Sequence, residues 1–293
     1  MSERLAFLFP GQGGSLTALP TGSPRLDALI AQTRARGLRL ADWMENGDEN
    51  RLRQTDAAQP ALLLDSLDRE ETLRAAGFQP SIVAGHSLGE YSALVSAGVL
   101  RAEDALDAVI ERGRLMNTVV GTMAAIVKLD LETVSSLCKE AGSDVVIANH
   151  NGPTQIVVSG SFEAVDSVCE LATGAGGKAI PLTVSGPFHS PFMLPAQEAL
   201  AVRLDTLVFS PPSIPVVSGV TGETHSSAAG LKMLLRRQIT APVRWIDVLC
   251  KLVEFGVTTA IEVGSGDILT KIGKRSGRKI RFITSEEAIH EGS

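Results

Sequence analysis

The chain predicts an α/β fold: a mostly parallel sheet covered by helices, with a small domain inserted near the middle of the chain. Two observations carry this prediction. Short apolar runs that end at glycine or proline alternate with segments of helical periodicity, a pattern typical of a parallel sheet buried on both faces. A central stretch instead gives the order β-α-β-β-α-β, which is the pattern of a ferredoxin-like unit. The length of 293 residues allows one large domain or two smaller ones.

The first part of the chain predicts two buried strands and their helices. Leu5–Phe9 is a continuous apolar run that ends at Pro10-Gly11, so we expect a strand buried on both faces. Ser81–Gly85 predicts a second such strand, and Ser92–Ala97 predicts a helix after it. Three other segments repeat apolar residues at helical spacing: Pro24–Arg36, Gln59–Ala76 and Glu103–Met116.

The central segment supplies the predicted insert. Its expected strands are Met123–Leu129, Asp144–Asn149, Gln155–Ser159 and Lys178–Val184, and its expected helices are Leu131–Ala141 and Phe162–Ala172. A turn containing Asn151-Gly152-Pro153 separates the middle two strands. We therefore place a ferredoxin-like subdomain at residues 119–185, inserted into a catalytic domain formed by residues 1–118 and 186–293.

The remainder of the chain returns to the first pattern. The expected strands are Ile214–Val220, Thr258–Val263 and Lys279–Ile283, and the expected helices are Pro191–Leu204, Leu231–Ile239 and Trp245–Phe255. These elements complete the α/β core.

Composition narrows the class of protein. Hydrophobic residues make up 44% of the chain and charged residues 20%, which excludes wholesale disorder. A net charge of −6 and an aromatic content of 4% argue against nucleic acid as a partner. The three cysteines have neither zinc-ligand spacing nor a disulfide framework. The sequence lacks a membrane-spanning run and a recognisable signal peptide, so we expect a cytoplasmic protein without a membrane partner.

The segment Gly85-His86-Ser87-Leu88-Gly89 is the sharpest local feature. It has the form G-x-S-x-G and lies between a predicted strand and a predicted helix, which is the context of a nucleophile elbow. The glycines permit a tight turn, and the start of the helix offers free N–H groups beside Ser87. The alternative is a glycine-rich turn with a capping serine. The context favours Ser87 as a nucleophile.

A serine nucleophile needs a base, and the chain has five histidines. Four are poorly placed, because they lie next to the serine, in a polar tail, in a polar loop and in a turn of the insert: His86, His290, His225 and His150. His189 lies in a proline-flanked loop at the predicted junction of the two domains, so it is the best base by position. A capping or turn role for His189 stays open.

Arg112 is the third candidate. It lies in a predicted helix whose other face is apolar, so its side chain points either inward, toward an anionic group, or into solvent. In the second case it complements the helix dipole near the C-terminal end of that helix.

Six ordered motifs cover nearly the whole chain. They are Phe9-Pro10-Gly11-Gln12-Gly13, Gln59-Pro60-Ala61-Leu62, Gly85-His86-Ser87-Leu88-Gly89-Glu90-Tyr91, Arg112-Gly113, Ser185-Gly186-Pro187-Phe188-His189-Ser190 and Pro242-Val243-Arg244-Trp245. Together they resemble the malonyl-CoA:acyl-carrier-protein transacylases, and more broadly the acyltransferase domains of fatty-acid and polyketide synthases. The resemblance implies an α/β-hydrolase-like core with a ferredoxin-like insert.

The resemblance also implies roles for single residues. Ser87 matches the nucleophile and His189 the general base. Arg112 matches the arginine that pairs with the free carboxylate of the malonyl group. Gln12 and Leu88 match the positions whose backbone N–H groups form the oxyanion hole.

Four further positions follow from the same resemblance. Gln238 matches the residue whose backbone carbonyl orients the histidine. Gln59 and Asn149 match pocket-lining positions, and Phe188 narrows the pocket against branched acyl groups. The sequence departs from the family pattern at residues 14–20 and in the length of the helix after Gln59, which puts contacts with CoA or the carrier in doubt.

The reaction implied is a two-step acyl transfer. A malonyl group passes from malonyl-CoA to Ser87, and then to the phosphopantetheine thiol of an acidic acyl carrier protein. No metal and no tightly bound cofactor is expected, and we expect a monomer. Fatty acid biosynthesis is the expected pathway. A polyketide synthase, a malonate decarboxylase system, a serine hydrolase and an inactive scaffold stay open as alternatives.

Two groups of basic residues could receive an acidic carrier. One contains Lys271, Lys274, Arg275, Arg278, Lys279 and Arg281, and the other contains Lys232, Arg236 and Arg237. The alternative for each is an ordinary solvated face.

Overall fold

A six-stranded sheet forms the centre of the larger part of the molecule. The computed structural model describes residues 4–13 and 23–292. The strands of this sheet are β1 (Leu5–Phe9), β2 (Ile82–Gly85), β7 (Val216–Val217), β8 (Thr224–His225), β9 (Thr259–Glu262) and β10 (Arg281–Thr284). Their order is β10-β9-β1-β2-β7-β8, and all neighbours are parallel except β7 and β8. The expected mostly parallel sheet is confirmed.

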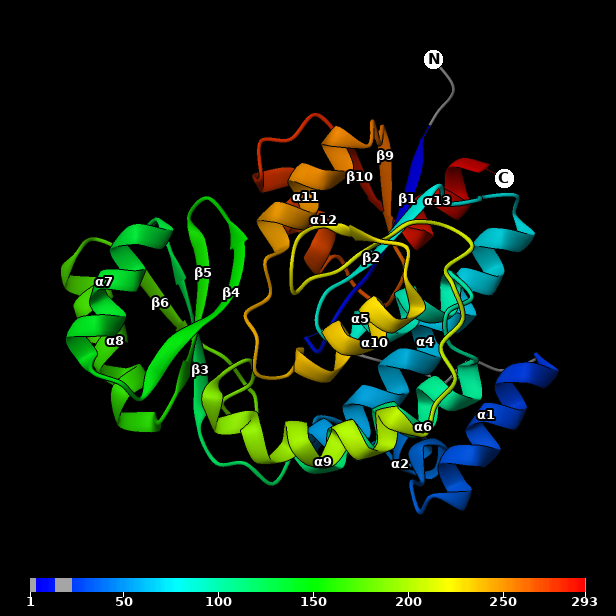
Figure 1. Cartoon of the computed structure of the whole chain (residues 1–293), viewed down its shortest axis with the longest axis horizontal. Coiled ribbons are helices and arrows are strands. Elements are labelled where there is room, and N and C mark those ends of the chain that lie inside the picture. Colours follow the sequence, from blue (N-terminus) through cyan, green and yellow to red (C-terminus); the bar gives the residue numbers. More distant parts are fainter. Residues whose placement is uncertain (1–3, 14–22, 293) are drawn as a thin grey trace.

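Helices cover both faces of this sheet (Figure 1). They are α1 (Pro24–Ala35), α2 (Leu40–Glu45), α3 (Glu49–Leu52), α4 (Thr55–Ala75), α5 (Gly89–Ser96), α6 (Ala102–Met116), α9 (Leu194–Asp205), α10 (Ala228–Arg237), α11 (Trp245–Glu254), α12 (Ile268–Arg275) and α13 (Ser285–Gly292). Strand β1 is buried along its whole length. Phe7 and Phe9 pack into the core with α4 and α6, whereas Ala6 and Leu8 pack with α11 and α12. Each large apolar side chain buried in this way contributes about 1.5–3 kcal/mol.

The insert is a separate antiparallel sheet with two helices on one face. It contains β3 (Thr122–Val127), α7 (Leu131–Ala141), β4 (Val145–Gly152), β5 (Gln155–Gly160), α8 (Phe162–Gly174) and β6 (Lys178–Pro181). The strand order is β4-β5-β3-β6, and α7 and α8 close a core of their own over this sheet. Figure 1 shows the insert beside the larger part, with β4 toward it. The ferredoxin-like insert is thereby confirmed as part of the fold class, whereas its boundaries at residues 119 and 185 stay a prediction.

Strand β4 also pairs with a segment of the larger part. The N–H of His150 donates to the carbonyl of Val243 at 2.9 Å, and the N–H of Val243 donates to the carbonyl of Ala148 at 2.8 Å. These bonds form a short parallel bridge across the junction. The edge of the insert is therefore fixed to the chain just before α11.

The predicted turn at Asn151-Gly152-Pro153 is wrong in its position. Asn151 and Gly152 close strand β4, and His150 lies in that strand rather than in a turn. Two register irregularities let β4 run longer against β5 than its apolar pattern indicates. Only Pro153 and Thr154 remain between the strands, which is the usual length of a tight hairpin connection.

Four other sequence-based expectations also need correction. His225 lies in the short strand β8 and His290 in α13, rather than in a loop and a tail. The strand expected at Ile214–Val220 shrinks to Val216–Val217, since Pro215 has no N–H to donate to a ladder. The helix expected from Gln59 begins at Thr55, because polar residues in its first turn hide its start from the apolar pattern. Helices α2, α3, α12 and α13 were not predicted.

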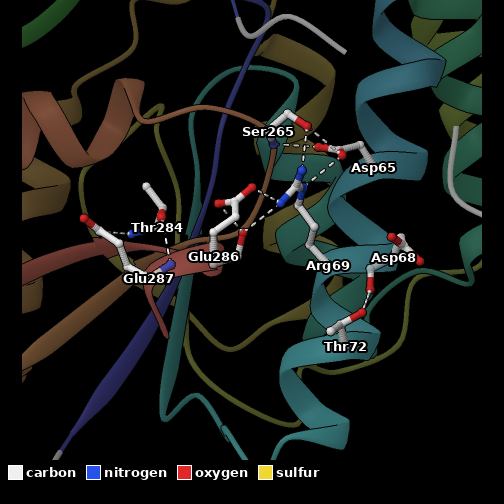
Figure 2. Close-up of polar contacts among 9 residues, drawn as sticks. Asp65, Asp68, Arg69, Thr72, Ser265, Thr284, Glu286 and Glu287 are labelled. Atoms are coloured by element: carbon white, nitrogen blue, oxygen red, sulfur yellow. Dashed lines mark hydrogen bonds and ion pairs between the residues drawn. The ribbon is translucent and has the colours of Figure 1, made fainter. Parts of the chain in front are cut away.

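A polar network around Arg69 joins three separate segments (Figure 2). Arg69, on α4, donates to Asp65 at 2.9 Å, to Ser265 at 2.9 Å and to Ser285 at 3.2 Å, and it forms an ion pair with Glu286. Asp65 also accepts from the backbone and hydroxyl of Ser265, at 2.6 and 2.8 Å. The network fixes the loop between β9 and α12 and the start of α13 to the long helix.

Candidate active site

The G-x-S-x-G segment forms the predicted strand–turn–helix element. Strand β2 ends at Gly85 and α5 begins at Gly89, with Ser87 between them at φ 54°. A Cβ on Gly85 would lie 2.1 Å from the backbone of Gly89, and one on Gly89 would lie 2.0 Å from the carbonyl oxygen of Phe9. Only glycine permits these approaches. The tight turn therefore places Ser87 just beyond the carboxyl end of β2.

The serine and His189 are in direct contact. Ser87 Oγ lies 2.7 Å from His189 Nε2, while His189 Nδ1 lies 3.0 Å from the carbonyl of Gln238 and 2.9 Å from that of Ala241. Carbonyl oxygens only accept, so Nδ1 carries the proton and Nε2 is the acceptor for the serine hydroxyl. Two backbone carbonyl groups thus orient the ring, and among the described residues no carboxylate accepts from Nδ1.

His189 is buried and is held neutral. Burial, assisted by the nearby charge of Arg112, lowers the pKa of His189 to about 3. The two carbonyl groups act in the opposite direction and do not overcome the burial. A neutral imidazole at physiological pH is the form that accepts a proton from serine.

Arg112 points inward and reaches the nucleophile. Its side chain is 1% exposed, and Nη2 donates to Ser87 Oγ at 3.1 Å and to the side-chain oxygen of Gln238 at 3.2 Å. The guanidinium also lies over the ring of Tyr91, 5.8 Å from its centroid. Of the two orientations left open by the sequence, the structure has the inward one.

His86 joins the elbow to the insert. It is half-buried, and its Nε2 lies 2.9 Å from Oδ1 of Asn151 at the end of β4. Its ring meets that of Trp245 edge-on at 5.2 Å. Burial lowers the pKa of His86, so this second histidine is neutral as well. Sequence reasoning had no basis for this contact, because it had placed Asn151 in a turn.

The site also contains a buried carboxylate that was not predicted. Glu90 accepts hydrogen bonds from Ser218 Oγ and from the side-chain amide of Gln238, both at 2.7 Å. The same amide donates to the backbone carbonyl of Ser87 at 2.8 Å. An acidic residue in the first turn of a helix ordinarily complements the helix dipole, so the sequence pattern of Glu90 conceals this role.

The other predicted residues lie around this centre. Gly11 packs against the elbow, where a Cβ would lie 2.8 Å from the carbonyl of His86, and this brings the segment that carries Gln12 beside the serine. The side-chain amide of Gln12 contacts Thr55 at 3.4 Å. Leu88 precedes α5, where helical N–H groups have no acceptor within the helix.

Three predicted pocket residues are buried, and none of their hydrogen bonds among the described residues reaches the serine. Gln59 donates to the sulfur of Met116 at 3.6 Å, and its side-chain oxygen has no partner among the described residues. Asn149 is 9% exposed and Phe188 is 7% exposed. The departure from the family pattern at residues 14–20 lies outside the described residues.

The chain is similar to known proteins over nearly its whole length. The model of the family described as acyl transferase domain matches residues 6–290. The malonyl CoA-acyl carrier protein transacylase of Bacillus subtilis is 40% identical over 96% of this chain and 93% of its own. That of Escherichia coli K12 is 37% identical over 93% of this chain and 92% of its own.

Solved structures give the same result. The malonyl CoA-acyl carrier protein transacylase of Coxiella burnetii superposes with a TM-score of 0.92 at 34% identity, covering 99% of this chain and 96% of its own. A structure described as a type II PKS acyl-carrier protein in complex with its malonyl-transacylase gives 0.91 at 35% identity, covering 99% of this chain and 100% of the matched chain.

Proposed function

The chain belongs to the malonyl CoA-acyl carrier protein transacylase family of acyl transferases, and from this membership we propose that it moves a malonyl group from malonyl-CoA to the phosphopantetheine thiol of an acyl carrier protein. One observation carries the proposal. The buried cation of Arg112 lies 3.1 Å from the hydroxyl of Ser87, which itself contacts the neutral His189. A nucleophile next to a fixed cation fits an acyl group that bears its own carboxylate.

The first step forms a malonyl ester on Ser87. His189 Nε2 takes the hydroxyl proton as Oγ attacks the thioester carbonyl, and the C–S bond then breaks. The proton passes from His189 to the departing sulfur, so CoA leaves as a thiol. The backbone N–H groups of Leu88 and Gln12 are our candidates for the donors that meet the oxyanion; such a donor is typically worth about 2.7–4 kcal/mol.

The second step reverses the first with a different thiol. His189 takes the proton of the phosphopantetheine thiol as its sulfur attacks the ester carbonyl, and then returns that proton to Ser87 Oγ. The malonyl carboxylate stays on Arg112 in both steps, because a planar guanidinium binds a carboxylate through two parallel hydrogen bonds. An acetyl group would leave the buried cation unpaired.

This chemistry draws only on groups of the chain itself. Ser87 is the nucleophile, His189 is the base and Arg112 is the cation, while backbone N–H groups meet the oxyanion. The proposal therefore includes no metal and no tightly bound cofactor. We assign the reaction to fatty acid biosynthesis, where the carrier is an acidic protein. A polyketide synthase carrier would use the same steps, and comparing rates with the two kinds of carrier distinguishes the pathways.

Mapping the covalent intermediate tests the proposal. The protein is mixed with malonyl-CoA, quenched in acid and digested, and the mass of each peptide is measured. A malonyl adduct is expected on the peptide that contains Ser87 and nowhere else. An adduct at another residue would overturn the mechanism. Release of free malonate in the presence of carrier, without malonyl-carrier, would instead indicate a hydrolase.

A further inference from the structure

Arg112 carries a buried charge, and no carboxylate within the described part of the chain forms an ion pair with it. Its two hydrogen bonds go to neutral groups, the hydroxyl of Ser87 and the amide oxygen of Gln238. Its Nε has no partner among the described residues, and none of the ion pairs formed within them includes it. An isolated buried cation is costly unless another charge compensates it. The negative charge that balances Arg112 must therefore belong to a group that is not one of its hydrogen-bond partners.

Glu90 supplies the opposite charge. Its side chain is 2% exposed, and each carboxylate oxygen accepts one hydrogen bond, from Ser218 and from Gln238. Both oxygens act as acceptors, as in an ionised carboxylate. Burial raises the pKa of Glu90 above its ordinary value, and these two hydrogen bonds and the charge of Arg112 oppose that rise only in part.

The amide of Gln238 separates the two charges. Its oxygen faces Arg112 and its nitrogen faces Glu90, and this orientation is obligatory because a guanidinium only donates and a carboxylate only accepts. A direct ion pair would occupy the donors of Arg112. With the amide between them, the charge is balanced at a distance and the guanidinium stays open to a ligand.

From this arrangement we propose that Glu90 sets the strength with which Arg112 binds an acyl carboxylate, as a positioning residue that acts through Gln238. The proposal rests on the proposed function, in which Arg112 binds the malonyl carboxylate. The negative charge of Glu90 stabilises the empty site and opposes the arriving carboxylate. It therefore weakens malonyl binding and lets the malonyl-carrier leave.

Glu90→Gln tests this, because it removes the charge and keeps the shape. The hydroxyl of Ser218 can turn to accept from the new amide, so no buried polar group is stranded. We expect kcat/KM for malonyl transfer to rise relative to acetyl transfer by about tenfold, equivalent to about 1.4 kcal/mol. The gain should lie in a lower KM for malonyl-CoA, with slower transfer from Ser87 to the carrier thiol. A ratio changed less than twofold, or lowered, would overturn the proposal.

Matched variants distinguish charge from structure. Ser218→Ala removes a hydrogen bond that lowers the pKa of Glu90, so it should shift the malonyl-to-acetyl ratio in the same direction as Glu90→Gln and by less, and a shift in the opposite direction would contradict a charge effect. In an Arg112→Ala background, Glu90→Gln should no longer change the ratio, and a persisting change would overturn the coupling. If Arg112→Ala alone keeps the malonyl preference, it is the proposed function that fails.

A second substitution covers the case in which Glu90→Gln does not fold. Gln238→Glu brings a second carboxyl group against Glu90, so the two groups must share one proton, and the remaining negative charge lies next to Arg112 instead of one amide away. The variant keeps the backbone carbonyl that faces His189. We expect at least a tenfold loss of malonyl transfer relative to acetyl transfer. An unchanged ratio in this variant would also contradict the proposal.

Discussion

Ser87 and His189 both have a backbone conformation that side chains rarely adopt. Their φ angles are 54° and 58°, and among the described residues other than glycine only Lys128 shares a positive value. A non-glycine residue held there costs on the order of 1–3 kcal/mol. Two strained residues, far apart in sequence, thus face each other at 2.7 Å. The packing around Ser87 and His189 therefore holds both residues in a left-handed conformation that they would not adopt on their own.

Replacing Ser87 by glycine and by alanine separates strain from chemistry. Both variants lose the nucleophile, and both should fold. Glycine relieves the left-handed conformation and alanine does not, so Ser87→Gly should be more stable than Ser87→Ala by about 1 kcal/mol. Urea unfolding of the two variants measures this difference. Equal stability would mean that the elbow stores no strain at Ser87.

Substitution of Arg112 should change acyl specificity rather than acylation as such. Removing one partner of a buried charge pair typically costs about 2–5 kcal/mol. Arg112→Ala should therefore lose most malonyl transfer while it keeps or improves acetyl transfer. Steady-state rates with malonyl-CoA and acetyl-CoA measure both. Equal losses for the two substrates would point to a folding defect.

The low pKa of His189 predicts a broad acid limb. An ordinary histidine has a pKa near 6.5 and stops acting as a base below that pH. Because the pKa of His189 is about 3 in the folded protein, His189 stays neutral and active well below pH 6.5. The rate at which an uncharged fluorophosphonate modifies Ser87 should therefore change less than about twofold between pH 8 and pH 5. An unshifted histidine would lose about 30-fold over that range. The intrinsic hydrolysis of the reagent is the control.

The low pKa of His189 also makes the free energy of unfolding depend on pH, although the reactivity of Ser87 hardly does. Between pH 6.5 and 3 the unfolded chain binds a proton at His189 that the folded protein does not bind. The stability is therefore complete above pH 6.5 and declines as the pH falls toward 3. Reactivity and stability should thus diverge in mild acid, which a paired measurement at pH 5 reveals.

At the scale of elements, helix α12 links the first motif to a basic surface. Its first residue, Ile268, lies against Gly13, where a Cβ would come within 2.9 Å of its side chain. Of the six basic residues grouped by sequence, Lys271 and Arg281 form ion pairs, and Arg278 contacts the sulfur of Cys250. Within this group of six, Lys274, Arg275 and Lys279 are exposed and take part in none of the ion pairs among the described residues.

The second basic group is largely engaged within the fold. Lys232 donates to the backbone carbonyls of Asp205 and Leu207, and Arg236 forms an ion pair with Asp205. We therefore keep α12 as the proposed docking surface for an acidic carrier, since exposed and unpaired charges are free to meet a partner.

Charge reversal on α12 should weaken carrier recognition and leave acylation unchanged. Lys274→Glu with Arg275→Glu should raise KM for the carrier and flatten its dependence on salt, because rim charges act on association. Single-turnover acylation of Ser87 by malonyl-CoA should not change. Reversal of Lys139 and Lys178 on the insert, which are exposed and take part in none of the ion pairs among the described residues, alters the net charge equally and serves as control. Unchanged carrier kinetics would make α12 an ordinary solvated face.

The network around Arg69 should contribute measurably to stability. Arg69→Met leaves Asp65, whose side chain is 9% exposed, without its cation. We expect a loss of about 2–3 kcal/mol, below the range for fully buried pairs because Arg69 is partly exposed. Arg25→Met breaks the more exposed pair with Glu71 and should cost less than about 1 kcal/mol. Similar losses in the two variants, from urea unfolding, would contradict a special role for this network.

For the molecule as a whole, periodicity predicted the fold better than it predicted the site. The apolar run of β1 and the central β-α-β-β-α-β order indicate the two sheets, because burial leaves a local trace in the sequence. The contact between Ser87 and His189 needed the family motifs as well. Glu90 and Asn151 escaped prediction, since their partners lie in distant segments and their local patterns resemble a helix start and a turn.

The bridge between β4 and Val243 determines how the molecule can move. It joins the insert to the short segment whose carbonyls orient His189, and the contact between His86 and Asn151 joins the insert to the elbow. Swinging the insert away would break these bonds, at about 0.5–1.5 kcal/mol for each, and would misalign the base as well. We therefore expect the insert to act as a stationary wall. Turnover then requires no closing motion of the insert, and substrates enter and leave a site whose walls are already in place.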